Sequence, residues 1–415
     1  MKLRTLSAAT HLKGVRVLIR VDWNVPIEGS YVGEKGLKLE RTFGTIRDLE
    51  RRGAVVVVMT HLGRPKRRDP KISTERLAQA ARRMSGVPFR FCGEAIDTKE
   101  GLAKADALIR AAKPGTVFLL ENVRFLKGEE TNAAPVAKAL ASLVDIFIND
   151  AFASSHRSHA SVVGVAKLLP SYAGPELVDE VSALTHLLEK PKHPYVAVVG
   201  GAKLSTKLGV IAALLKVADR VLIGGAMAHP FYLAKRLSIG KSYVEKDGVP
   251  LARKLLKDPK LALPTDAVVA PKLDPKKVRV AFIDDIKASE VIGDIGTETM
   301  MTWSAWLKKA KTIAWNGPVG VAEIPTFSHG SLVLARTIAS RSKGECYGVV
   351  GGGDTLPIVA RSGMAEWMDH ISTGGGAMLE FISNNGDLPG LRVLQAKVPA
   401  TRKPKKTSKK KTKRE

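Results

Sequence analysis

Short runs of Val, Ile and Leu recur along the whole 415-residue chain, each bounded by glycine or polar residues. A stretch with helical character follows each run. Strands that alternate with helices in this way are typical of βαβ units, in which a helix connects two parallel strands. The pattern therefore predicts an α/β protein built on parallel sheets.

The predicted strands form two series that differ in the residues at their carboxyl ends. In the first series the strands end in charged and polar side chains. This series covers 15–26, 54–65, 116–125 and 144–153. In the second series the ends are mostly glycine. This series covers 195–203, 220–228, 312–320, 347–355 and 370–378.

The segment between the two series predicts a helix that joins two domains, because its apolar residues repeat at helical spacing before Pro191. These residues are Leu177, Val181, Leu184, Leu187 and Leu188. A chain of this length is also too long for one ordinary core. We therefore expect a first domain at 1–173, an interdomain helix at 174–190, a second domain at 191–384, and residues 385–399 packed back on the first domain.

Composition predicts a soluble protein of the cytoplasm. Apolar residues make up 45% of the chain, and no apolar run reaches the roughly 18 residues of a membrane helix. The N-terminal apolar segment is interrupted by Lys13, Arg16 and Arg20, so it lacks the core of a signal peptide. Cys92 and Cys346 are far apart without metal-type spacing, as expected of free thiols in a reducing cytosol.

The formal net charge of +26 is unusual, and nine basic residues and one glutamate in 401–415 contribute +8 of it. Because a Lys-rich run with proline has nothing to bury, we expect a basic, disordered tail at 400–415. The rest of the chain is also basic, which favours anionic ligands or contact with polyanions. Lysines suffice for weak, nonspecific binding of nucleic acid, but the tail has no aromatic residues on which bases could stack.

Side chains that suit an anionic ligand follow the strands of the first series, and ligands of open parallel sheets bind beyond the carboxyl ends of the strands. They are Asp22, Asn24, His61, Arg64, Arg124 and Arg157, with Arg41 after the first strand. Guanidinium groups present forked donors that match carboxylate and phosphate oxygens. One such arginine is more often a solvated or ion-paired group, but several at equivalent positions favour a small molecule with several negative charges.

Glycines follow the strands of the second series, as in VVGGGDTLP at 349–357. Without side chains the backbone can approach a ligand closely, and the N–H groups of a following helix attract anions. A single glycine pair also serves tight turns and close helix packing. Five successive strand ends of this kind predict a nucleotide site, although neither the GxxxxGK[ST] loop nor the GxGxxG fingerprint occurs.

Three charged residues near these glycines are candidate phosphate and metal ligands. Lys203 and Lys207 are four residues apart, which would place both on one face of a helix that begins there, within reach of one phosphate chain. The alternative is a solvated helix face. Asp354 follows three glycines and suits Mg²⁺ on a nucleotide, because such sites often use one carboxylate with phosphate oxygens and waters. It would alternatively cap the following helix.

Nine motifs resemble those of phosphoglycerate kinase, over about residue 14 to about residue 392. They are RVDWNVP, THLGRP, LLENVRF, DAFASSHRSHAS, VVGGAKLSTK, IGGAMA, WNGPVGVAE, GGGDT and STGGGAMLEF. The resemblance implies two Rossmann-like three-layer α/β domains with parallel sheets, joined by a hinge helix. It also implies a monomeric enzyme of glycolysis and gluconeogenesis that transfers a phosphoryl group reversibly between 1,3-bisphosphoglycerate and ADP, giving 3-phosphoglycerate and ATP, with Mg²⁺.

The resemblance also implies a role for each matching residue. The phosphoglycerate would be held by Asp22, Asn24, Arg41, His61, Arg64, Arg124 and Arg157. The nucleotide would be held by Lys203, Lys207, Asn316, Glu323, Gly351, Gly352, Gly353, Asp354 and Thr355. Within this set Glu323 would meet the ribose and Asp354 the metal. The catalytic groups would be Arg41, Lys207 and the helix N–H groups at Gly374, Gly375 and Gly376.

The chain departs from the family's usual motifs at a few positions. They are Trp23 for Phe, Ala226 for Gly, His229 and Pro230 for a Phe and a polar residue, and Thr297 for Pro. These departures leave the chemistry intact but affect the details of the adenine pocket. No catalytic base is required, because the carboxylate that attacks in one direction is already ionised at neutral pH.

Two other classes of protein fit parts of the sequence. A basic scaffold that only holds nucleic acid would explain the charge. A metal hydrolase would use His156 and His159, but their spacing of three without a carboxylate partner favours a substrate loop. Asp284 and Asp285 would point to opposite faces of a strand, so they are not expected to share a metal.

Overall fold

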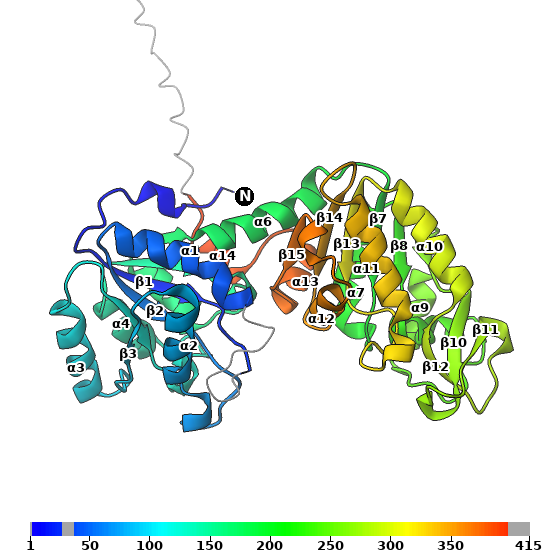
Figure 1. The fold of residues 1–415 in the computed structure, drawn as a ribbon, viewed down its shortest axis with the longest axis horizontal. Helices are drawn as coiled ribbons and strands as arrows, with labels where there is room; N and C mark the ends of the chain where they lie inside the picture. Colours follow the sequence, from blue (N-terminus) through cyan, green and yellow to red (C-terminus); the bar gives the residue numbers. More distant parts are fainter. Residues whose placement is uncertain (1, 27–36, 397–415) are drawn as a thin grey trace, which may run out of the picture.

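The computed structural model describes residues 2–26 and 37–396, which contain two six-stranded parallel sheets side by side along the long axis (Figure 1). The first sheet has the order β3-β4-β2-β1-β5-β6. Its strands are β1 (Arg16–Val21), β2 (Val55–Met59), β3 (Arg90–Cys92), β4 (Val117–Leu120), β5 (Ile146–Asp150) and β6 (Ser171–Ala173). The helices of this part are α1 (Leu37–Arg51), α2 (Glu75–Ser85), α3 (Lys99–Arg110), α4 (Ala134–Ser142) and α5 (Val165–Leu168).

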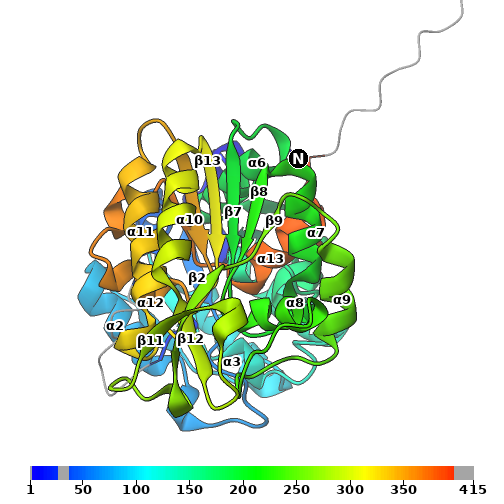
Figure 2. The same ribbon diagram turned by 90° about the vertical axis from the view of Figure 1, so that its right-hand side faces the viewer.

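The second sheet has the order β15-β14-β13-β7-β8-β9 and faces the viewer in Figure 2. Its strands are β7 (Tyr195–Val199), β8 (Arg220–Ile223), β9 (Leu261–Ala262), β13 (Thr312–Asn316), β14 (Tyr347–Gly351) and β15 (His370–Ser372). Its helices are α7 (Leu208–Val217), α8 (His229–Ala234), α9 (Gly248–Leu255), α10 (Thr297–Lys309), α11 (His329–Arg341), α12 (Leu356–Arg361) and α13 (Gly376–Ser383). The predicted class of two Rossmann-like α/β units with parallel sheets is confirmed.

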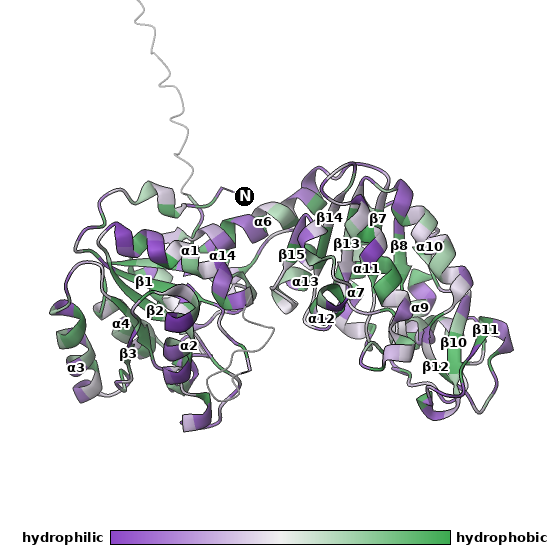
Figure 3. Cartoon of the chain, viewed as in Figure 1, coloured by the Kyte–Doolittle hydropathy of each residue, from purple (hydrophilic) through white to green (hydrophobic). Residues whose placement is uncertain are grey.

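Both sheets are covered on both faces, which is why their central strands carry apolar residues on both faces rather than on alternate positions only. In β1, Val17 and Ile19 pack into one cluster while Leu18 packs into another on the opposite face. In β7, Ala197 and Val198 divide in the same way between two clusters. Hydrophobic colour accordingly runs along the strands between more polar helices (Figure 3).

Residues 266–295 form a small antiparallel sheet that the sequence pattern did not reveal. Its strands are β10 (Asp266–Ala270), β11 (Arg279–Phe282) and β12 (Val291–Ile295), at the end of the molecule far from the first sheet (Figure 1). The side chains of β11 are partly exposed, so its strand signal is weak. Asp284 and Asp285 lie in a 3₁₀ turn beside it, so the assignment of this pair to a strand was wrong.

Helix α6 (Pro175–Glu189) runs from the first sheet to the second (Figure 1). The carboxylate of Asp150, at the end of β5, accepts a hydrogen bond of 3.1 Å from the N–H of Leu177 and so holds the first turn of α6. After α13 the chain returns to the first part through α14 (Pro389–Arg392). There the N–H of Gly390 donates to the carbonyl of Ser155, and that of Arg4 donates to the carbonyl of Leu394.

Three further observations concern the sequence expectations. No helix within the described ranges is long and apolar enough to cross a bilayer. Cys92 and Cys346 are buried free thiols. The basic tail expected at 400–415 and residues 397–399 lie outside the described residues.

Candidate active site

His61, which follows β2, is held by a buried arginine that the sequence analysis did not single out. Arg20 in β1 is 1% exposed, and its Nη2 lies 3.0 Å from Nδ1 of His61. Because a guanidinium only donates, Nδ1 accepts and the ring proton is on Nε2. Burial and the charge of Arg20 lower the pKa of His61 to about 2, so the ring is neutral at pH 7. Its Nε2–H is therefore available as a hydrogen-bond donor.

Three of the four expected arginines of the first part, Arg64, Arg124 and Arg157, interact electrostatically with His61 or with one another. Arg124 and Arg157 each act electrostatically on His61, and burial together with the charges of Arg157 and Arg64 lowers the pKa of Arg124. The side chain of Arg124 is 4% exposed and contacts Glu130 at 2.6 Å. Cationic groups that lower one another's pKa in this way create a net positive potential, which suits an anionic ligand.

Asp22 and Asn24 lie beside this basic cluster. The carboxylate of Asp22 is 2.7 Å from the ammonium of Lys38. Burial opposes its ionisation, but Lys38 holds the pKa of Asp22 below its ordinary value. The Oδ1 of Asn24 accepts a 2.9 Å hydrogen bond from the N–H of Gly63. This bond joins the loops after β1 and β2.

Arg41 lies where α1, α6 and the second sheet meet. Its Nη1 donates to Glu176 of α6 at 2.9 Å, and its Nη2 donates to the carbonyl of Ile371 in β15 at 2.6 Å. A narrow cleft next to it is also lined by Asp22, Lys38 and Thr373. Arg41 therefore comes from the first part of the chain but contacts the second.

Glu180, in the middle of α6, was missed by the sequence reading. Its side chain is 1% exposed and accepts hydrogen bonds of 3.0 Å from Nε2 of His370 and from the N–H of Thr373. The Nη1 of Arg41 is 3.7 Å away. The signal in the sequence was a glutamate on the apolar side of this helix, next to Val181 and one turn before Leu184. Glu180 connects the interdomain helix to the loop before α13.

That loop ends in the glycines at the start of α13. Gly375 has φ 47° and ψ −106°, a conformation that a side chain would strain. A Cβ at Gly374 would collide with the ring of Phe152, and one at Gly376 would lie 3.8 Å from Nε2 of His156. The N-terminus of α13 therefore faces the loop after β5 in the first part.

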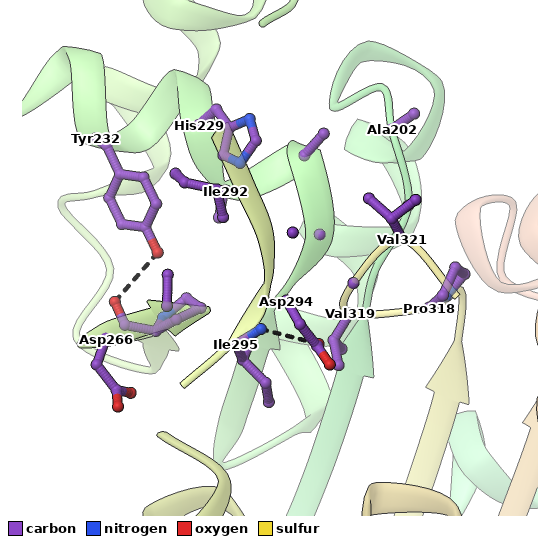
Figure 4. Close-up of a pocket in the computed structure, with 18 of the residues that line it drawn as sticks. Ala202, His229, Tyr232, Asp266, Ile292, Asp294, Ile295, Pro318, Val319 and Val321 are labelled. Carbon is purple, nitrogen blue, oxygen red and sulfur yellow. Dashed lines mark hydrogen bonds between the residues drawn. The ribbon is translucent and has the colours of Figure 1, made fainter. Parts of the chain in front are cut away.

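A cavity of about 260 Å³ opens at the carboxyl ends of the strands in the second part (Figure 4). His229, Tyr232 and Ile292 line one side of it in Figure 4. Pro318, Val319 and Val321 line the other side. Glu323, which is exposed, also lines this cavity. Its walls are largely apolar, as is typical of small-molecule pockets.

The glycines of the second part do not all serve a ligand. A Cβ at Gly200 would collide with the carbonyl of Pro318, and one at Gly317 would collide with that of Gly200, so these two allow the ends of β7 and β13 to touch. A Cβ at Gly351 would collide with Met378. Around Gly353, by contrast, a Cβ would meet nothing within 4 Å. Of the three glycines before Asp354, Gly353 is the one next to open space.

Lys207 sits at the junction of β7 and β13. Its Nζ donates to the carbonyl of Gly200 and to Oδ1 of Asn316, both at 2.6 Å. Burial lowers the pKa of Lys207 to about 8, and the charge of Asp354 opposes this shift. Lys203 is exposed and precedes the 3₁₀ turn Ser205–Lys207 that leads into α7. The expectation that both lysines share one helix face was therefore wrong.

Asp354 is exposed, between Gly353 and the start of α12. The N-cap of α12 is Thr355, so the alternative of Asp354 as the cap is wrong. The Oγ1 of Thr355 accepts a 2.8 Å hydrogen bond from the N–H of Gly317, which ties the loops after β13 and β14 together. Within the described residues no three His, Cys, Asp or Glu side chains group as metal ligands, and this includes His156 and His159.

Comparisons with known proteins agree on one family. A family model described as phosphoglycerate kinase matches residues 7–385. The phosphoglycerate kinase of Thermus thermophilus is 44% identical over 390 residues, which are 92% of this chain and 97% of that protein. That of Rhizorhabdus wittichii is 40% identical over 404 residues, 95% of this chain and 100% of that protein.

Solved structures give the same result. The phosphoglycerate kinase of Coxiella burnetii superposes with a TM-score of 0.80 at 37% identity, covering 95% of this chain and 99% of that one. The enzyme of Pyrococcus horikoshii gives a TM-score of 0.81 at 30% identity, covering 94% and 98%. Since the family model and these relatives cover almost all of the sequence, the chain belongs to the phosphoglycerate kinase family.

Proposed function

We propose that this protein is a working phosphoglycerate kinase that transfers a phosphoryl group between 1,3-bisphosphoglycerate and ADP. One observation carries the proposal: a basic cluster around His61 and an apolar cavity at the strand ends lie on different sheets, and the N-terminus of α13 faces the first part from the second. Such a divided site suits a reaction in which two anionic substrates have to be brought together while water is excluded.

In this proposal the basic cluster binds the phosphoglycerate. Arg64, Arg124 and Arg157 supply forked donors to its phosphate and carboxylate oxygens, and His61 adds its Nε2–H. Asp22 is ionised beside Lys38 and accepts from a hydroxyl group of the substrate. Asn24 fixes the loop that carries Arg64 through its bond to Gly63.

The nucleotide occupies the second part. Its base enters the apolar cavity, its ribose meets Glu323, and its phosphates extend toward Lys203, Lys207 and the loop Gly351–Gly352–Gly353–Asp354–Thr355, with Asn316 holding Lys207 in place. Asp354 is a single exposed carboxylate within electrostatic reach of Lys207, a donor set that fits Mg²⁺ shared with phosphate oxygens. When bound, Mg²⁺ neutralises charge on those oxygens.

No residue has to remove a proton, because the acceptor is a carboxylate or a phosphate. The chain instead aligns the two anions and surrounds the moving phosphoryl group with positive potential. Arg41, Lys207 and the N–H groups at Gly374, Gly375 and Gly376 would supply it. We propose that the protein closes about a hinge at the helix 174–190. One moving body would be 1–173 with 385–399, and the other would be 191–384. Closure would bring these groups together.

The assay that tests this function measures ADP formation from ATP, Mg²⁺ and 3-phosphoglycerate, with the acyl phosphate trapped so that the unfavourable equilibrium is drawn forward. Turnover that requires all three components is the expected result. ADP formation that is independent of 3-phosphoglycerate, or no turnover by folded protein, would contradict the proposal.

Replacing Asp354 by alanine should raise the Mg²⁺ concentration needed for half-maximal rate by roughly tenfold to 100-fold, because one charged partner contributes roughly 1.5–3 kcal/mol. The measurement is a Mg²⁺ titration at saturating substrates. Glu366→Ala, which removes another carboxylate of the second part, is the control and should leave the titration unchanged. An unaltered Mg²⁺ requirement in Asp354→Ala would exclude the proposed metal contact.

Weak binding of nucleic acid, the monomeric state and the cytoplasmic location remain predictions. The tail that would carry most of the nucleic-acid contact lies outside the described residues.

A further inference from the structure

His229 lines the cavity that is proposed for the nucleotide base, and it is one of the positions where the chain departs from the family's usual motif. It is the first residue of α8 and is 3% exposed. Its Nδ1 lies 2.6 Å from the carbonyl oxygen of Tyr243. Because a carbonyl only accepts, Nδ1 carries the ring proton.

The other ring nitrogen of His229 has no partner. Burial lowers the pKa of His229, so the ring is neutral at pH 7 and Nε2 is a bare acceptor. This atom is buried and has no hydrogen bond. Among the described residues that line the cavity, His229 is the one with a buried side-chain nitrogen or oxygen left unpaired.

The other buried polar side chains of the cavity are already paired. The hydroxyl of Tyr232 donates to the carbonyl of Pro264 at 3.2 Å. Asp266 accepts from the N–H of Thr299 at 2.8 Å. Asp294 accepts from the N–H of Gly330 at 2.8 Å. A donor on a molecule in the cavity would therefore supply the partner that Nε2 of His229 lacks, since buried polar groups are rarely left unpaired.

We propose that Nε2 of His229 accepts a hydrogen bond from the exocyclic amino group of the base, so that this pocket selects an aminopurine such as adenine. The inference rests on the proposed nucleotide site. Gly201 lies near the Nζ of Lys207 and also lines the cavity, so a nucleotide with phosphates at Lys207 would extend past Gly201 into the cavity that His229 lines.

The test compares two ligands that differ only in the amino group. ADP and purine riboside 5′-diphosphate are titrated into the full chain by calorimetry, with Mg²⁺ present. ADP should bind about tenfold more tightly, because the second ligand leaves a buried acceptor unpaired. Equal affinity of the two ligands overturns the inference. If neither ligand binds, the nucleotide site itself is wrong.

Variants of His229 localise the effect. In His229→Asn an amide nitrogen can replace Nδ1 and keep the bond to Tyr243, but no atom remains at the position of Nε2. His229→Phe keeps a ring without either nitrogen. In both variants the ratio of the two dissociation constants should fall from about ten to about one.

Tyr232→Phe is the matched control, because it removes a polar group from the same wall whose hydrogen bond stays within the protein. In this control variant the ratio of the two dissociation constants should remain about tenfold. A tenfold ratio that persists in both His229 variants would show that another group reads the amino function and would overturn the assignment.

Discussion

Replacing Arg41 by alanine should lower kcat by about 100-fold to 1,000-fold, while the dissociation constant of the nucleotide changes little. Arg41 belongs to α1 in the first part, yet its guanidinium contacts Ile371 in the second and lies beside the cleft that Thr373 lines. From there it can meet charge that develops on the phosphoryl group during transfer. Its hydrogen bonds go to Glu176 and Ile371, and neither of these residues lines the proposed base pocket.

The same substitution also removes the ion pair with Glu176, so a control has to separate structure from catalysis. Glu176→Gln breaks this ion pair but leaves the guanidinium in place. It should retain most of the turnover. If Glu176→Gln lost as much activity as Arg41→Ala, or if Arg41→Ala weakened nucleotide binding as much as turnover, Arg41 would act through domain contact instead of through the transition state.

Replacing Glu180 by alanine should lower the free energy of unfolding by about 3 kcal/mol and also lower kcat. The substitution leaves the N–H of Thr373 and Nε2 of His370 without their acceptor in a buried place. It also removes a carboxylate 3.7 Å from Arg41. The loop before Gly374 would lose its attachment to α6, so the N-terminus of α13 would be less well positioned.

Urea unfolding followed by tryptophan fluorescence measures the first effect, and steady-state kinetics measures the second. The matched control is Asp179→Ala, because Asp179 is the preceding residue on the same helix but is exposed. Its free energy of unfolding should change by less than about 0.5 kcal/mol. A similarly small change in Glu180→Ala would mean that the contacts of Glu180 do not hold the two parts together.

Most of the strands that the sequence failed to predict are short or lie at edges, and β10, which has five residues and is the middle strand of the antiparallel sheet, is the exception. β3 has three residues and begins with the exposed Arg90, and β9 has two partly buried residues. β11 pairs on one side only and presents Phe282 to solvent. Edge strands bury few side chains, so they lack the run of apolar residues that identifies a central strand.

The site was also predicted unevenly. Sequence position placed His61, Arg124 and Arg157 at strand ends, and the structure brings them together because parallel strands end at one edge of a sheet. It did not find Arg20, which lies among the buried apolar residues of β1, or Glu180, which lies on the apolar side of α6. A buried charge is tolerated only where a partner far away in the sequence reaches it, and periodicity carries no information about that partner.

The sequence by itself determined the two parallel sheets, the helix between them and the family, because buried strands need apolar residues and strand ends need glycine or polar ones. Only the tertiary structure decided which groups meet. It placed Arg41 against Ile371 of β15, 330 residues away. It also made Gly200 and Gly317 a backbone contact instead of a phosphate contact, and it left Nε2 of His229 unpaired beside the cavity. These outcomes depend on distances between segments remote in sequence, which packing fixes and local patterns do not encode.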